Sequence, residues 1–91
     1  MTVFEEESGT FYELAKNYMD ALLNLQRDEA GRMIIKAVEE GTDIKDIYIH
    51  VFESSQHEIG RLWQTNIITV AQEHFCTAAT QMIMSQLYPY I

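Results

Sequence analysis

The side chains of this sequence that could carry chemistry stand close together in its second half. Trp63, Glu73, His74 and Cys76 lie within one short stretch, and they include the only tryptophan and the only cysteine. Glu73 and His74 are residue types that serve in acid–base catalysis and in metal binding. A zinc protease would need a second histidine four residues from the first, with a glutamate beside it, and none is present. We therefore predict neither a catalytic residue nor a metal ligand in this stretch.

The other candidates have simpler interpretations. His50 and His57 lie seven residues apart, which is too far for both to bind one metal ion directly from a single helix. We interpret both as solvated surface side chains. No base or set of oxyanion-stabilising donors accompanies Cys76, so we expect a small buried residue and not a nucleophile. The sequence thus argues against an enzyme.

The start of the last predicted helix determines where the carboxylate and the imidazole lie. Thr69 and Gln72 are typical of a capping box, in which each side chain accepts a hydrogen bond from the other residue's backbone N–H. A helix that begins after Thr69 brings four residues to one face: Val70, Glu73, His74 and Thr77. Together with the tryptophan at the end of the preceding helix, we expect them to form a polar-lined aromatic pocket at a helix–helix corner.

Apolar residues at helical spacing predict four helices. Their expected ranges are about 11–25, 27–40, 43–63 and 70–88. Gly41 predicts a left-handed end to the second helix, and Thr42 or Asp43 a cap for the third. Pro89 ends the fourth helix. Because the connecting loops are short, neighbouring helices must alternate in direction, so the predicted fold is all-α, an antiparallel four-helix bundle over residues 11–91.

A glycine lies inside the third predicted helix. Gly60 costs about 1 kcal/mol relative to alanine at such a position. We expect a compensating close approach there, either by a neighbouring helix or by a ligand.

Composition limits the classes of protein that this chain can represent. Its 91 residues, 47% hydrophobic and 22% charged, suit one folded domain. Six basic and fourteen acidic residues give a net charge of −8, which repels phosphate, so we expect no direct binding of nucleic acid. We find no membrane span and no signal peptide, and one cysteine suits a reducing compartment, so we expect a soluble cytoplasmic protein. Residues 1–10, which include three consecutive glutamates, are interpreted as an acidic lead-in or linker.

The combined pattern is more specific than its parts. It consists of two segments, which are Gly60-x-Leu62-Trp63 and Val70-x-x-Glu73-His74. This pattern resembles the helical cap module of cobalamin-binding sensory and regulatory proteins, which is related to the cap of methionine synthase. The resemblance extends over residues 11–87 or so. It is closer to the light- or cobalamin-sensing regulators than to the corrinoid carriers of methyltransferase systems, which generally lack the tryptophan and the Glu-His pair.

The resemblance implies a cofactor, adenosylcobalamin or methylcobalamin, and only half of its binding site. It assigns the cover of the upper axial ligand to four residues: Trp63, Val70, Glu73 and His74. The β-α-β pattern and the Asp-x-His-x-x-Gly loop that bind the lower face are not in these residues. We therefore expect a cobalamin-binding Rossmann-like domain as the partner, downstream of Ile91 in the native chain.

We interpret the chain as the cap of a cobalamin-dependent sensor or regulator that covers the upper axial face of the corrinoid. Two other interpretations stay open. One is the cap of a corrinoid methyl-carrier protein, which would transfer methyl groups together with a partner methyltransferase. The other is a ligand-free helical interaction module that docks a protein, or a second copy of itself, through an exposed Trp63 corner. Homo-oligomerisation and the role of light are also left open.

Overall fold

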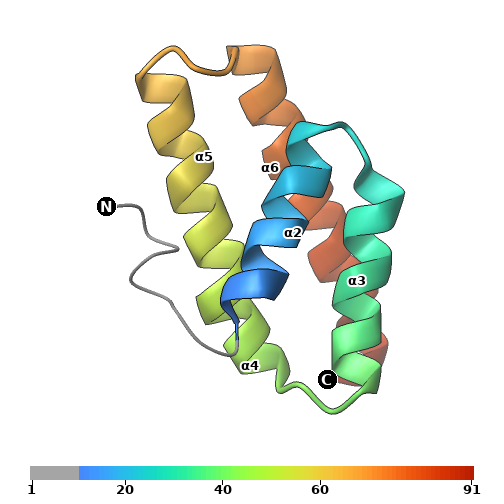
Figure 1. The fold of residues 1–91 in the computed structure, drawn as a ribbon. Coiled ribbons are helices and arrows are strands. Elements are labelled where there is room, and N and C mark those ends of the chain that lie inside the picture. The colour runs from blue at the N-terminus through green and yellow to red at the C-terminus, as the bar shows by residue number, and fades with distance from the viewer. Residues whose placement is uncertain (1–10) are drawn as a thin grey trace.

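Helices form almost all of the structure that the computed structural model describes, residues 11–91, and this range contains no strand (Figure 1). In chain order the elements are α2 (Tyr12–Leu23), α3 (Arg27–Glu39), α4 (Ile44–Ile47), the π-helical segment η1 (Tyr48–Glu53), α5 (Ser54–Gln64), α6 (Val70–Gln86) and the short 3-10 helix η2 (Tyr88–Tyr90). Because α4, η1 and α5 follow one another without a break, residues 11–91 form four packed helices that alternate in direction. The predicted all-α four-helix bundle is confirmed. The predicted acidic lead-in, residues 1–10, lies outside the described residues.

The ends of the helices follow the expected signals. Asp43 caps the third helix, where its carboxylate accepts a hydrogen bond from the Lys45 backbone N–H at 2.9 Å. Both bonds of the Thr69–Gln72 capping box are present, at 3.1 and 2.8 Å, so α6 begins at Val70 as predicted. Gly41 has a φ of +105°, which is the left-handed end expected for α3.

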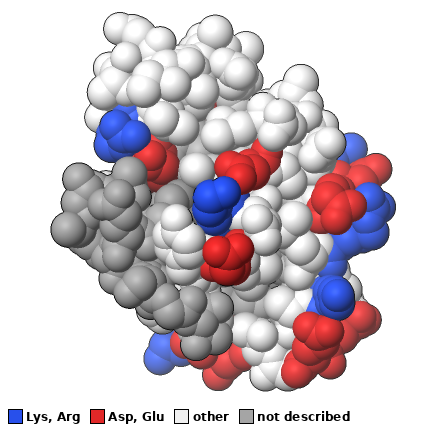
Figure 2. All heavy atoms as spheres, viewed as in Figure 1, with Lys and Arg blue, Asp and Glu red and all other residues white. Residues whose placement is uncertain are grey.

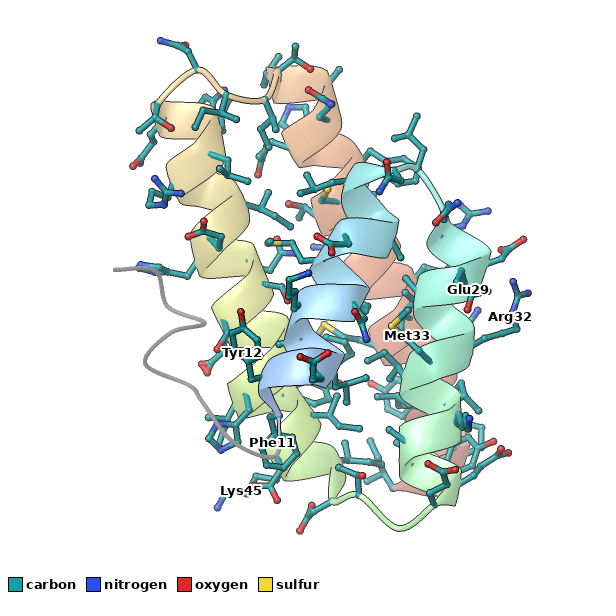
Figure 3. The ribbon with its side chains drawn as sticks, in the orientation of Figure 1. Phe11, Tyr12, Glu29, Arg32, Met33 and Lys45 are labelled. Atoms are coloured by element: carbon teal, nitrogen blue, oxygen red, sulfur yellow. The ribbon has the colours of Figure 1, made fainter. Side chains whose placement is uncertain are left out.

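The third helix is not a uniform α-helix, which is a correction to the predicted continuous helix over 43–63. Its middle, Tyr48–Glu53, widens into a π-helix and so rotates all later residues relative to the earlier ones. Both Val51 and Phe52 of this segment are buried. His50 is partly buried and stacks on Phe11 with ring centroids 4.8 Å apart. Phe11 precedes the first residue of α2 and is labelled in Figure 3. The expected solvation of His50 was therefore wrong, whereas His57 is exposed as predicted.

The core lies between α2, η1, α5 and α6, and α3 covers one side of it. Its largest fully buried apolar side chains come from every long element: Tyr18, Leu22, Ile34, Ile47, Ile59, Ile83 and Leu87. Burying one such side chain contributes roughly 1.5–3 kcal/mol. Cys76 is buried as predicted, and burial raises the pKa of its thiol to about 11. No helix in the described range is long and apolar enough to span a bilayer.

Candidate functional site

The turn between α5 and α6 sets the positions of Trp63 and Val70. After α5 ends at Gln64, the Asn66 N–H bonds the Trp63 carbonyl at 3.0 Å and the Ile67 N–H bonds the Leu62 carbonyl at 2.8 Å. This pair of bonds is a Schellman motif, with Asn66 in the left-handed conformation at a φ of 62°. The motif fixes the direction in which the chain leaves α5. It places the tryptophan just before the turn and the start of α6 just after it.

The corner is an open face, where a polar-lined aromatic pocket was predicted. Trp63 is 43% exposed and Val70 is 50% exposed. No hydrogen bond or ring contact within residues 11–91 joins Trp63 to Glu73 or His74. The structure brings the four predicted residues to one end of the molecule, and a side-chain ion pair joins Glu73 and His74.

Glu73 and His74 form a close pair at the start of α6. Glu73 Oε1 lies 3.0 Å from His74 Nδ1, and its Oε2 accepts a hydrogen bond from the Thr77 hydroxyl at 3.1 Å. The Glu73 side chain is 25% exposed and the His74 side chain 76% exposed. With Nδ1 directed at the carboxylate, His74 offers Nε2 to the solvent side as a hydrogen-bonding group. The pair therefore presents polar atoms beside the apolar corner.

The stretch that links Trp63 to the Glu73–His74 pair carries no charged side chain. Residues 62–72 contain no Lys, Arg, Asp or Glu, although the chain has six basic and fourteen acidic residues. Figure 2 shows the result, since the upper end of the molecule is white and the charged side chains lie below it. The exposed apolar side chains there are Trp63, Ile67 and Val70. An exposed apolar surface of this kind is typical of a binding site.

Gly60 extends this face along α5. The Cβ that an alanine would add meets no atom within 4 Å, so the predicted close approach by a neighbouring helix is wrong. Gly60 and Trp63 are three residues apart, which places them on the same side of the helix. The absence of a side chain therefore leaves bare helix backbone beside the indole.

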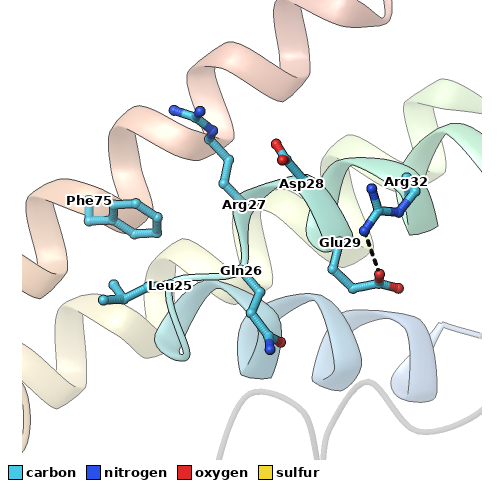
Figure 4. Close-up of a pocket in the computed structure, with 7 residues that line it drawn as sticks. All are labelled: Leu25, Gln26, Arg27, Asp28, Glu29, Arg32 and Phe75. Carbon is cyan, nitrogen blue, oxygen red and sulfur yellow. Dashed lines mark hydrogen bonds and ion pairs between the residues drawn. The ribbon is translucent and has the colours of Figure 1, made fainter.

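A second apolar spot at the same end was not predicted from the sequence. Leu25, in the turn between α2 and α3, is 63% exposed and has a φ of 60°. Figure 4 shows it beside Phe75 of α6, in a hollow whose polar side includes Arg27 and Asp28. A left-handed conformation is unusual for leucine and costs on the order of 1 kcal/mol. No sequence signal distinguishes this leucine from the apolar residues of α2.

Comparison with known proteins places this arrangement in a family. The profile of the B12 binding domain family matches residues 14–88, which is most of the chain. The chain belongs to this family of helical, cap-type B12-binding domains. Searches of curated proteins and of solved structures each found no match. B12-binding caps associate with cobalamin and typically pair with a B12-binding Rossmann domain.

The residues of this B12-binding cap that could contact a cofactor lie at the open corner. Residues 11–91 contain no group of three or more His, Cys, Asp or Glu that could hold a metal ion. What they offer is an exposed indole, an open stretch of backbone at Gly60 and the Glu73–His74 pair. These features fit one face of a large planar ligand that carries a polar group at its centre.

Proposed function

We propose that this domain covers the upper axial face of a cobalamin that a Rossmann-like domain of the native protein holds from below. The observation that carries the proposal is the open end of the bundle, where residues 62–72 carry no charged side chain. There Trp63 and Val70 stand exposed beside the Glu73–His74 pair, in a chain of the B12-binding family. An aromatic ring this exposed, in a domain with a well-packed core, is available to pack on a ligand.

Each of the four residues has a separate part in this proposal. Trp63 covers the corrin and its axial group, and excludes water and bulky competitors. Val70 packs beside the indole. Glu73 and His74 form hydrogen bonds with a polar upper ligand, such as the ribose of an adenosyl group, whereas a methyl group offers them no partner. The polar pair thus favours adenosylcobalamin over methylcobalamin.

The role that fits these contacts best is that of a sensor or regulator. Contacts between this domain and an upper axial ligand exist only in the state that carries the ligand. Their loss changes the relative free energy of two arrangements of cap and partner domain, which is what a ligand-dependent switch requires. We propose a binding role for the corner and assign no reaction to it.

The same exposed corner also supports a second candidate, a protein-interaction module. Ile67, at 65% exposure, extends the apolar surface beyond the four residues, and protein interfaces favour such patches. In that case the isolated domain should associate in a concentration-dependent manner, and Trp63→Ala should abolish the association.

The test of the cap proposal is the affinity of the native protein for adenosylcobalamin. We expect Trp63→Ala to weaken binding by roughly tenfold or more, since buried tryptophans at interfaces commonly contribute this much. Tyr88→Ala is the matched control, because Tyr88 is an exposed aromatic residue at the other end of α6. Unchanged affinity in Trp63→Ala would overturn the proposal.

A further inference from the structure

The carboxylate of Glu73 is held from inside the bundle as well as by His74. The Thr77 hydroxyl, one turn further along α6, donates to Glu73 Oε2 at 3.1 Å. The same hydroxyl lies 3.1 Å from Oε1 of Gln56, which belongs to α5. Thr77 therefore connects the carboxylate at the open corner with the neighbouring helix.

The connection continues from Gln56 into the core. Its Nε2 donates to the Thr80 hydroxyl at 3.1 Å. The Thr80 hydroxyl in turn lies 2.7 Å from the hydroxyl of Tyr18 on α2. Tyr18 is fully buried and Thr80 nearly so. A line of polar groups, each within hydrogen-bonding distance of the next, thus joins the candidate site to the contact between α2, α5 and α6, which pack against one another (Figure 1).

The Thr77 hydroxyl has two possible acceptors in this line. A hydroxyl has one hydrogen, yet Glu73 and Gln56 each present an acceptor oxygen at the same distance from it. The Glu73 carboxylate competes strongly for this hydrogen, because hydrogen bonds to charged acceptors are the stronger ones. A ligand hydroxyl that donates to Glu73 weakens that competition and lets Thr77 donate to Gln56.

Stability of the fold explains the Tyr18–Thr80 hydrogen bond, but it does not explain the positions of Gln56 and Thr77. Tyr18 and Thr80 are buried polar groups that need partners, and each satisfies the other. Gln56 and Thr77 are only partly buried, so water could satisfy them. Their alignment between the core pair and the Glu73 carboxylate is what a positioning function requires.

We propose that Thr77 and Gln56 are positioning residues for Glu73. They orient its carboxylate toward a hydroxyl-bearing upper ligand, and they transmit the occupancy of that carboxylate to Tyr18. The identity of the ligand rests on the function proposed above, whereas the coupling between Glu73 and Tyr18 is a property of the ligand-free domain. The two parts can therefore be tested separately.

The first test is NMR spectroscopy of the ligand-free chain. Glu73→Gln should shift the side-chain amide signals of Gln56 and the ring signals of Tyr18. In a Thr77→Val background the same substitution should leave both sets unchanged, and Thr77→Ser should restore the response because it keeps the hydroxyl. Glu53→Gln, at an exposed carboxylate outside the line, is the control. Equal responses in the Thr77→Val background and in the parent would overturn the coupling.

The second test uses the native protein with adenosylcobalamin and methylcobalamin as probes. Thr77→Val should weaken adenosylcobalamin binding by roughly two- to tenfold, the effect of one lost hydrogen bond, and leave methylcobalamin binding unchanged. Thr77→Ser should bind like the parent. An equal loss for both cobalamins would contradict the positioning role. If the parent protein binds neither cobalamin, the proposed function fails, and the NMR result still decides the coupling.

Discussion

The bundle uses aromatic side chains in two different ways. In the π-helical segment, the ring of Phe52 is buried and contacts Tyr18 and Tyr48, with centroids 5.5 and 5.2 Å apart. At the α5–α6 end, Trp63 is 43% exposed and contacts no other ring in the described part of the chain. The comparison separates residues that hold the fold together from a residue that is left available for binding.

Truncation of one ring from each region should give the largest difference. We expect Phe52→Ala to lower the free energy of unfolding by about 3–5 kcal/mol, because it opens a cavity in the core. Trp63→Ala should change it by about 0.5 kcal/mol or less, since the indole has few packing partners to lose. Chemical denaturation of the 91-residue chain measures both values. A loss in Trp63→Ala as large as that in Phe52→Ala would refute the distinction.

The free energy of unfolding should also fall at alkaline pH, because Tyr18 is buried. Burial raises the pKa of Tyr18 from 10.0 to about 12. The folded state therefore retains the phenol proton more strongly than the unfolded state, so stability is unaffected below about pH 10 and falls as the pH rises toward about 12. The loss attributable to Tyr18 is on the order of 2–3 kcal/mol.

Denaturation at several pH values between about 9 and 12 checks this prediction. Tyr18→Phe should flatten the decline, although it also removes the hydrogen bond with Thr80 at every pH. Tyr88→Phe, at an exposed tyrosine, should leave the decline as it is in the parent. An equally steep decline in Tyr18→Phe would show that other groups cause it.

The substitution with the smallest expected effect on stability, Gly60→Ala, tests whether a ligand contacts the open face. Gly60→Ala should stabilise the domain by about 1 kcal/mol or less, because the added methyl group meets open space and alanine favours the helix. In the native protein the same substitution should weaken cobalamin binding, since the methyl group fills the backbone gap beside Trp63. Thermal denaturation and a binding titration measure the two effects. Stabilisation without any change in affinity would mean that no ligand approaches Gly60.

Most of the fold could be predicted from the sequence because its signals are local. The capping box at Thr69, the left-handed end at Gly41 and the cap at Asp43 each depend on a few neighbouring residues. The π-helical segment could not be predicted in this way. Its wider turn depends on how the third helix packs in the core, and the spacing of apolar residues over 44–63 is compatible with an uninterrupted α-helix.

The site could be predicted only in part, because some of its features depend on packing between helices and not on neighbouring residues. The shared face of Val70, Glu73 and His74 follows from a helix whose start is fixed by its capping box. The openness of the corner and the line through Thr77 and Gln56 depend on how α5 and α6 lie against each other. The left-handed Leu25 depends on the geometry of a turn that carries no glycine or asparagine at that position.

The most direct test of the central claim is a spectroscopic titration of the native protein with adenosylcobalamin, in the dark and with the Rossmann-like partner domain present. We predict saturable binding with a change in the visible absorption of the corrinoid, and a clear loss of affinity in Trp63→Ala but not in Tyr88→Ala. A native protein that leaves the corrinoid spectrum unchanged at every concentration would contradict the account and favour the protein-interaction module.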